Sequence, residues 1–154
     1  MNAPGTRPIQ LLLVDYQQAI RRGLKMRLAL EEDLEVVGEA RDAAEAIPRA
    51  SALRPDVVLM DVDMPDADGI MGIEKLRTAA PESAVVILTL RDDAATRERI
   101  RVAGAAAFVA KHQTEETLLV AIRRVAHGKQ RRHDRASAAR EEGHRDDMRD
   151  RGGP

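Results

Sequence analysis

Short, largely apolar runs alternate with amphipathic segments five times along this chain, and this alternation limits the fold more than any other feature. The runs lie at residues 9–14, 34–40, 57–60, 84–88 and 106–110. Each is followed by a stretch in which apolar residues recur at helical spacing. Strands that alternate with helices form a parallel sheet with helices on both faces. Right-handed crossovers then favour a flavodoxin-like, doubly wound α/β fold with strand order 2-1-3-4-5.

Capping residues and glycines mark the predicted ends of the helices. Asp42 is placed to cap the second helix, and Pro48 inside that helix predicts a kink or a late start. Gly104 is placed to end the fourth helix in the left-handed conformation. Thr114 is placed to cap the fifth helix, and Gly128 to close it.

The alternating pattern occupies residues 8–128, which form one predicted domain. Residues 1–7 lie outside it, and we expect them to be disordered. Residues 129–154 carry eight basic and six acidic side chains and no apolar period, so they cannot bury enough apolar surface to order themselves. We therefore expect a charged, disordered tail there in preference to a short helix at 135–142.

Composition excludes several classes of protein. The chain has no cysteine, which rules out disulfides and thiolate metal sites and favours a reducing compartment. No apolar stretch approaches the ~18 residues of a membrane span, and the first residues lack the layout of a signal peptide. The net charge of -1 gives no general attraction to nucleic acid. We expect a cytoplasmic protein without a membrane segment.

Chemistry-bearing side chains stand at the ends of four predicted strands, at Asp15, Asp61, Thr89 and Lys111. In a parallel sheet these ends share one edge, where α/β folds bind ligands. Asp61 can act as a nucleophile that forms an aspartyl phosphate, and Asp15 can help it to hold Mg²⁺ through oxygen ligands. Lys111 can neutralise phosphoryl oxygens, and Thr89 can hydrogen-bond one of them. Taken alone, Asp61 fits a helix cap or a turn equally well, but its neighbours at the other strand ends favour phosphoryl transfer.

Eight short motifs carry a resemblance to a known family. They lie at residues 12–15, 21–24, 36–40, 54–61, 64–65, 68–69, 86–89 and 104–111. In this order and spacing they make residues 8–128 resemble the receiver domain of bacterial two-component response regulators, most closely the NarL/FixJ type. The resemblance implies a phosphoryl group donated by a histidine kinase or a phosphotransfer protein. It also implies a switch in contacts with a downstream protein partner rather than enzymatic turnover, and it leaves a homodimer open.

The resemblance assigns roles to individual residues at the predicted edge. Asp61 would be the phosphoacceptor, and Asp15 would form part of an acidic pocket that holds Mg²⁺ together with Asp61. The backbone carbonyl of Asp63 would be a further metal ligand. The remaining roles fall on Thr89 as the switch hydroxyl, Phe108 as the switch aromatic residue and Lys111 as the phosphate-binding lysine.

Two features depart from the family pattern. Tyr16 follows Asp15 where the family has a second acid that contacts the metal, so we expect weaker Mg²⁺ binding. The alternative function is therefore a pseudo-receiver, a protein-interaction module that works without phosphorylation. After Gly128 the sequence lacks the apolar periodicity of a helix-turn-helix domain, so we do not expect direct DNA binding by this chain. A metal-dependent hydrolase is a third, disfavoured class, because no general base is evident beside Asp61.

Overall fold

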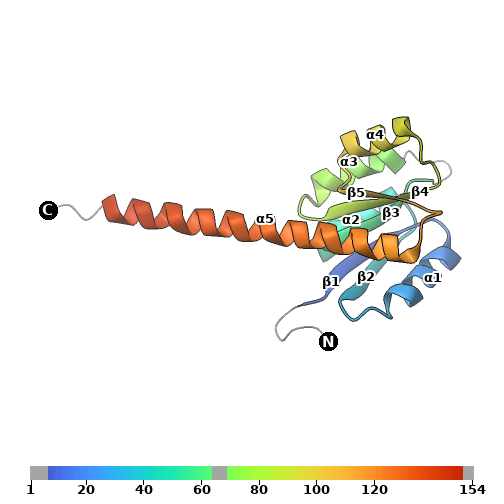
Figure 1. The fold of residues 1–154 in the computed structure, drawn as a ribbon, viewed down its shortest axis with the longest axis horizontal. Helices are drawn as coiled ribbons and strands as arrows, with labels where there is room; N and C mark the ends of the chain where they lie inside the picture. The colour runs from blue at the N-terminus through green and yellow to red at the C-terminus, as the bar shows by residue number, and fades with distance from the viewer. Residues whose placement is uncertain (1–6, 64–68, 151–154) are drawn as a thin grey trace.

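A computed structural model describes residues 7–63 and 69–150, and within them five strands alternate with five helices (Figure 1). Side chains are described throughout these ranges except at 130, 132, 133 and 143–150. The strands are β1 (Ile9–Val14), β2 (Leu34–Ala40), β3 (Val57–Asp61), β4 (Ala84–Thr89) and β5 (Ala107–Ala110). The helices are α1 (Gln18–Leu28), α2 (Ala43–Leu53), α3 (Gly69–Ala79), α4 (Ala94–Ala103) and α5 (Glu115–Asp150).

The five strands form one parallel sheet in the order β2-β1-β3-β4-β5, which confirms the predicted doubly wound fold. Two layers of helices enclose the sheet. Helices α2, α3 and α4 pack against one face, and α1 and α5 pack against the other (Figure 1). Because all strands run in the same direction, their carboxyl ends lie together at one edge of the sheet.

The central strand β3 is buried along its whole length. Val58 and Met60 pack on the side of α2, α3 and α4, whereas Val57 and Leu59 pack on the side of α1 and α5. Successive side chains of a strand point to opposite faces, so an unbroken apolar run fills both layers of the core. The strand then ends on Asp61, whose carboxylate is held at the boundary of this core with 2 % of the residue exposed.

The predicted helix caps are present, with one exception. The Asp42 carboxylate accepts a hydrogen bond from the Glu45 amide at 2.9 Å, so α2 begins ahead of Pro48. Of the predicted kink or late start, the late start is therefore wrong, and the kink stays a prediction. Gly104 ends α4 with φ of 108°, in the left-handed conformation that favours glycine. The Thr114 hydroxyl accepts a hydrogen bond from a backbone amide in the first turn of α5, as predicted.

Helix α5 passes through the glycine at which the sequence predicted its end. Gly128 lies inside the helix, and the helical backbone continues to Asp150. The predicted end at Gly128 is therefore wrong, and residues 129–150 are helical where a disordered tail was expected. A single glycine costs a helix only about 1 kcal/mol, and residues 129–150 contain no proline and many good helix formers. The described side chains of 131–142 are exposed, and this part of α5 projects from the domain (Figure 1).

The prediction for the N-terminal segment falls largely outside the described residues, which begin at Arg7. Arg7 itself is placed against the domain, because its guanidinium forms an ion pair with Asp56 at 2.8 Å. None of the described helices combines the length and the hydropathy that crossing a bilayer requires.

Candidate functional site

The carboxyl edge of the sheet brings the four predicted side chains together. Asp61 and Thr89 are the last residues of β3 and β4, which pair with Asp61 opposite Leu88. Asp15 and Lys111 directly follow β1 and β5. Asp15, Asp61 and Thr89 are all buried, whereas the Lys111 side chain is 27 % exposed and reaches inward from the rim. The site is therefore a polar cluster at the end of an apolar core.

Both oxygens of the Asp61 carboxylate are held by donors. Oδ1 accepts a hydrogen bond from the Asp63 amide at 2.8 Å, and Oδ2 accepts one from the Lys111 ammonium at 2.6 Å. Charge-assisted bonds of this kind are short and strong, and they fix the orientation of the carboxylate. Asp61 is thus a buried, oriented carboxylate whose lysine partner lies 50 residues away in the sequence.

The surroundings of the second buried acid, Asp15, raise the pKa of its carboxyl group. Burial raises the pKa of its carboxyl group, the hydrogen bond from the Gln17 amide opposes this, and the neighbouring charge of Asp61 raises it further. Two carboxylates at ~4 Å repel each other by roughly 4 kcal/mol at a surface-like dielectric. The pair therefore needs a shared proton or a cation.

Lys111 is the cation that the protein itself supplies. Burial acts to lower the pKa of its ammonium group, but the hydrogen bond to Asp61 and the charges of Asp61 and Asp63 outweigh burial and raise it. The group is therefore protonated at neutral pH. Its Nζ atom lies 2.6 Å from Asp61 Oδ2 and 3.4 Å from Asp63 Oδ2, so it bridges two acids.

The side chain of Asp63 hydrogen-bonds Thr89 and Leu90, two contacts that the sequence did not predict. The Thr89 hydroxyl donates to Asp63 Oδ1 at 2.9 Å, and the Leu90 amide donates to Oδ2 at 2.6 Å. The sequence held one signal for this, an acid two residues beyond Asp61 at the start of a loop. The predicted role of the Asp63 carbonyl remains a prediction.

The two predicted switch residues are both placed by the structure. Thr89 is fully buried, and its hydroxyl also accepts a hydrogen bond from the Arg91 amide at 3.0 Å. Phe108 is half-buried against the core on the side of α2, α3 and α4. The guanidinium of Arg97 lies 5.2 Å from the centre of its ring, a cation–π contact that the sequence did not reveal.

Tyr16, which directly follows the buried Asp15, turns partly towards solvent. The residue is 43 % exposed. Its hydroxyl accepts a hydrogen bond from the Gln17 side-chain amide at 2.8 Å. The position therefore adds no negative charge to the buried pair of Asp15 and Asp61.

The fit of this site to Mg²⁺ rests on that pair. Two buried carboxylates that repel each other are a donor set suited to a hard cation. Among the described residues, no three His, Cys, Asp or Glu side chains converge as metal ligands, and the Asp63 carboxylate faces Thr89 and Leu90. The residues thus fit a cation that takes two carboxylates and completes its shell with carbonyl or water oxygens. The motif residues at 64, 65 and 68 lie outside the described residues.

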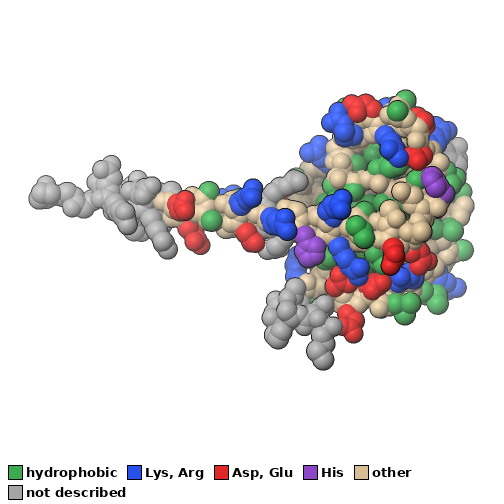
Figure 2. Space-filling view, viewed as in Figure 1, with side chains coloured by type: hydrophobic (Ala, Val, Ile, Leu, Met, Phe, Trp, Pro, Cys, Tyr) green, Lys and Arg blue, Asp and Glu red, His purple; other side chains and the backbone are tan. Residues whose placement is uncertain are grey.

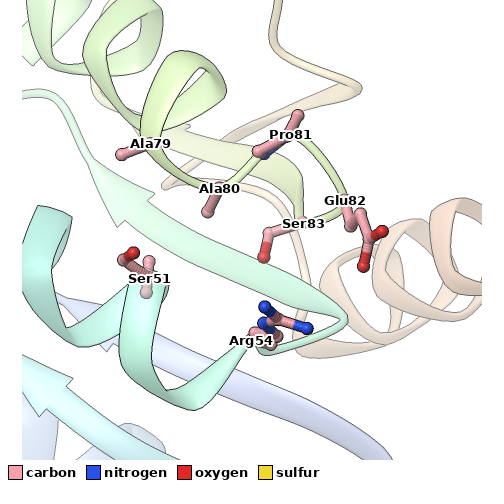
Figure 3. Close-up of a pocket in the computed structure, with 8 residues that line it drawn as sticks. Ser51, Arg54, Ala79, Ala80, Pro81, Glu82 and Ser83 are labelled. Carbon is pink, nitrogen blue, oxygen red and sulfur yellow. The ribbon is translucent and has the colours of Figure 1, made fainter.

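A separate hollow lies at the opposite edge of the sheet, near the amino end of β4 (Figure 3). Ser51 and Arg54 line it from the end of α2, and Glu82 and Ser83 from the loop before β4. The Ser83 hydroxyl donates to a backbone carbonyl there at 2.6 Å, which gives it a structural partner. This hollow shares no residue with the cluster around Asp61.

Comparison with known sequences gives a consistent result. The family model described as the response regulator receiver domain matches residues 11–123. The transcriptional regulatory protein DegU of Brevibacillus brevis is 32% identical over 120 residues, which cover 78% of this chain and 51% of DegU. LnrK of Bacillus subtilis is 33% identical over 120 residues, covering 78% of this chain and 54% of LnrK. The chain thus spans about half the length of these relatives.

Solved structures agree with the sequence comparison. The signal receiver domain of the response regulator NarL from Mycobacterium tuberculosis superposes with a TM-score of 0.73 at 30% identity, covering 79% of this chain and 98% of that one. The response regulator domain of Thermotoga maritima CheB gives a TM-score of 0.70 at 29% identity, again covering 79% and 98%. This chain is similar to both over the part that carries the sheet.

Proposed function

The chain belongs to the response regulator receiver domain family of two-component systems, and from this premise we propose that it accepts a phosphoryl group on Asp61. The donor is a histidine kinase or a phosphotransfer protein, and the result is a change in contacts with a downstream protein. Receiver domains are typically phosphoacceptor switches rather than enzymes.

One observation carries the proposal. The buried Asp61 carboxylate is hydrogen-bonded to Lys111 at 2.6 Å, at the strand edge that also holds Asp15 and Thr89. A helix cap or a turn residue, the other interpretation of Asp61, needs neither a lysine partner nor a second buried acid. A nucleophile that will carry a phosphoryl group needs both positive charge and hydrogen-bond donors around it.

The transfer itself requires little of the protein beyond positioning. An Asp61 oxygen forms a bond to phosphorus while the P–N bond to the donor imidazole breaks, and the imidazole nitrogen keeps the electron pair. Lys111 offsets the negative charge of the phosphoryl oxygens, and the Thr89 hydroxyl donates to one of them. Movement of Thr89 and repacking of Phe108 would then carry the change to the surface around α4 and β5.

Receiver domains generally bind Mg²⁺ at the phosphorylation site. In this chain Asp15 and Asp61 would hold the cation, with the Asp63 backbone carbonyl as a further ligand. When bound, it supplies positive charge against the phosphoryl oxygens. Tyr16 contributes no acid, so we propose that binding is weaker than two adjacent acids would give.

Phosphoryl uptake from acetyl phosphate tests the function directly. The protein is incubated with acetyl phosphate and saturating Mg²⁺, and its intact mass is followed. We expect a gain of one phosphoryl group that is lost in Asp61→Asn and kept in the matched control Glu35→Gln, which neutralises an exposed acid on β2. No gain at saturating Mg²⁺ would instead support the pseudo-receiver, for which Tyr16 is the motivating residue. Sustained turnover of a phosphoester would support a hydrolase.

A further inference from the structure

The carboxylate of Asp63 gathers three donors around the phosphoacceptor. Its Oδ1 accepts the Thr89 hydroxyl at 2.9 Å, its Oδ2 accepts the Leu90 amide at 2.6 Å, and Lys111 Nζ lies 3.4 Å from Oδ2. The Asp63 side chain is 19 % exposed, so these contacts form near the rim of the core rather than in bulk solvent. A hydroxyl, an amide and an ammonium group converging on two oxygens make an anion-binding site that is already filled.

This anion-binding site lies directly beside Asp61. The Asp63 amide donates to Asp61 Oδ1 at 2.8 Å, and Lys111 contacts both carboxylates. A phosphoryl group attached to Asp61 would extend from the same carboxylate that these donors surround. Under the proposed function, Thr89 and Lys111 are two of the donors that such a group requires, and the structure shows both of them engaged with Asp63.

We propose that the Asp63 carboxylate is an internal occupant of the phosphoryl-binding position. It is a positioning residue that holds the Thr89 hydroxyl turned into the site before any phosphorylation. This inference rests on the proposed function, because it identifies the donors as those of the phosphoryl group.

A phosphoryl group on Asp61 and the Asp63 carboxylate would compete for the same hydrogen-bond donors, and the phosphoryl group carries the larger charge. A phosphoryl group brings close to two negative charges and three acceptor oxygens, whereas Asp63 brings one charge and two oxygens. The Thr89 hydroxyl has one proton and cannot donate it to both groups, so phosphorylation must displace the Asp63 side chain from Thr89. Asp63 therefore slows the uptake of a phosphoryl group by Asp61. In the unphosphorylated protein it also holds the Thr89 hydroxyl through a hydrogen bond to an anionic oxygen, as a phosphoryl group would.

The first test reads the contact without phosphorylation. Solvent exchange of the Leu90 amide proton is measured by NMR in the full chain and in Asp63→Ala, Asp63→Asn and the control Glu35→Gln. We expect exchange to accelerate by roughly fivefold or more in Asp63→Ala, the factor of one typical hydrogen bond. Asp63→Asn, which keeps the size and one acceptor oxygen, should lie between Asp63→Ala and the unchanged chain. Equal exchange in all four proteins would overturn the proposal.

The second test measures whether the Asp63 carboxylate competes with the incoming phosphoryl group. With acetyl phosphate and saturating Mg²⁺, the initial rate of mass gain should rise by roughly fivefold in Asp63→Ala and by less in Asp63→Asn, with no change in Glu35→Gln. Equal uptake in both Asp63 variants would overturn the proposal. Slower uptake would also overturn it and would indicate that the side chain helps to hold the cation. If no protein takes up phosphate, the proposed function fails, whereas the Leu90 exchange rates still decide whether Asp63 occupies the site.

Discussion

Tyr16 contributes no carboxylate to the Mg²⁺ site that we propose at Asp15 and Asp61. The residue is 43 % exposed and adds no charge to the buried acids Asp15 and Asp61. We expect Tyr16→Asp to raise Mg²⁺ affinity by about tenfold, since affinity in oxygen-ligand sites follows the number of charged ligands. Calorimetric titration with Mg²⁺ measures the change. Tyr16→Phe, which removes the hydroxyl without adding charge, should leave the affinity as it is, and an equal affinity in Tyr16→Asp would contradict this account of the position.

Two glycines, one inside a helix and one at a helix end, have different structural roles. Gly104 has φ of 108°, and a Cβ there would meet the side chain of Arg77. Gly23 lies in α1 with nothing within 4 Å of its Cβ position and no positive φ. We expect Gly104→Ala to lower the free energy of unfolding by about 1–2 kcal/mol or more. Gly23→Ala should raise it by about 0.5–1 kcal/mol. Urea denaturation of both variants checks the signs, and a change of the same sign in both would show that the assigned backbone conformations are wrong.

At the scale of elements, α5 is tied to the turn before β2 by a two-pronged ion pair. Arg123 donates to Asp33 from Nε at 2.8 Å and from Nη2 at 2.9 Å. The hydrogen bond from Arg123 holds the pKa of the Asp33 carboxyl below its ordinary value. A carboxyl whose pKa is lower in the folded protein contributes stability above its unfolded pKa, and that contribution is lost as the pH falls through the folded value.

The expected result is a pH-dependent effect of Asp33→Asn. About a third of each side chain is exposed, so we expect the ion pair to contribute about 0.5–1 kcal/mol to the free energy of unfolding at pH 7, as exposed pairs do. The difference in unfolding free energy between the unchanged chain and Asp33→Asn should shrink as the pH is lowered towards about 3. Urea midpoints over this range measure this difference. Glu35→Gln is the control, because the exposed Glu35 forms no ion pair with an arginine among the described residues. A difference that stays constant with pH would argue against the ion pair as its source.

Most elements could be predicted because their signals are local. Asp42 and Gly104 act on their own helix ends, and the apolar run of β3 fills two layers whatever surrounds it. The predicted end of α5 at Gly128 was wrong because a glycine ends a helix only where the backbone adopts the left-handed conformation. Nothing in the sequence shows whether the backbone does so at Gly128. At the site, the strand ends could be placed from topology alone. The contacts of the Asp63 side chain could not be predicted in this way. They depend on the rotamer that Asp63 adopts and on Thr89, Leu90 and Lys111, which only the fold brings close to it.

At the scale of the whole molecule, one part of α5 packs against the sheet and the other part is exposed to solvent. Its first turns bury Leu118, Leu119 and Ile122 against the sheet. Further along, Lys129 reaches Asp56 at 3.5 Å, and beyond it the described side chains of 131–142 are exposed. Both basic and acidic side chains lie along this projecting part of the helix (Figure 2). A helix that is polar all round gains no burial, so its stability depends on propensity and on pairs of charges along its own surface.

This difference predicts that the projecting part of α5 melts separately from the domain. Most of the stability of a helix in a protein comes from tertiary packing, which the exposed side chains of 131–142 do not provide, whereas the buried turns of α5 unfold with the sheet. Removing residues 131–154 should therefore change the unfolding free energy of the domain by less than about 0.5 kcal/mol, the usual limit for surface changes. In the full chain, helical circular dichroism should fall in two stages on heating, and the first stage should be missing after truncation. A single coincident transition in the full chain, or a clear loss of stability on truncation, would mean that the extension contacts the domain and stabilises it.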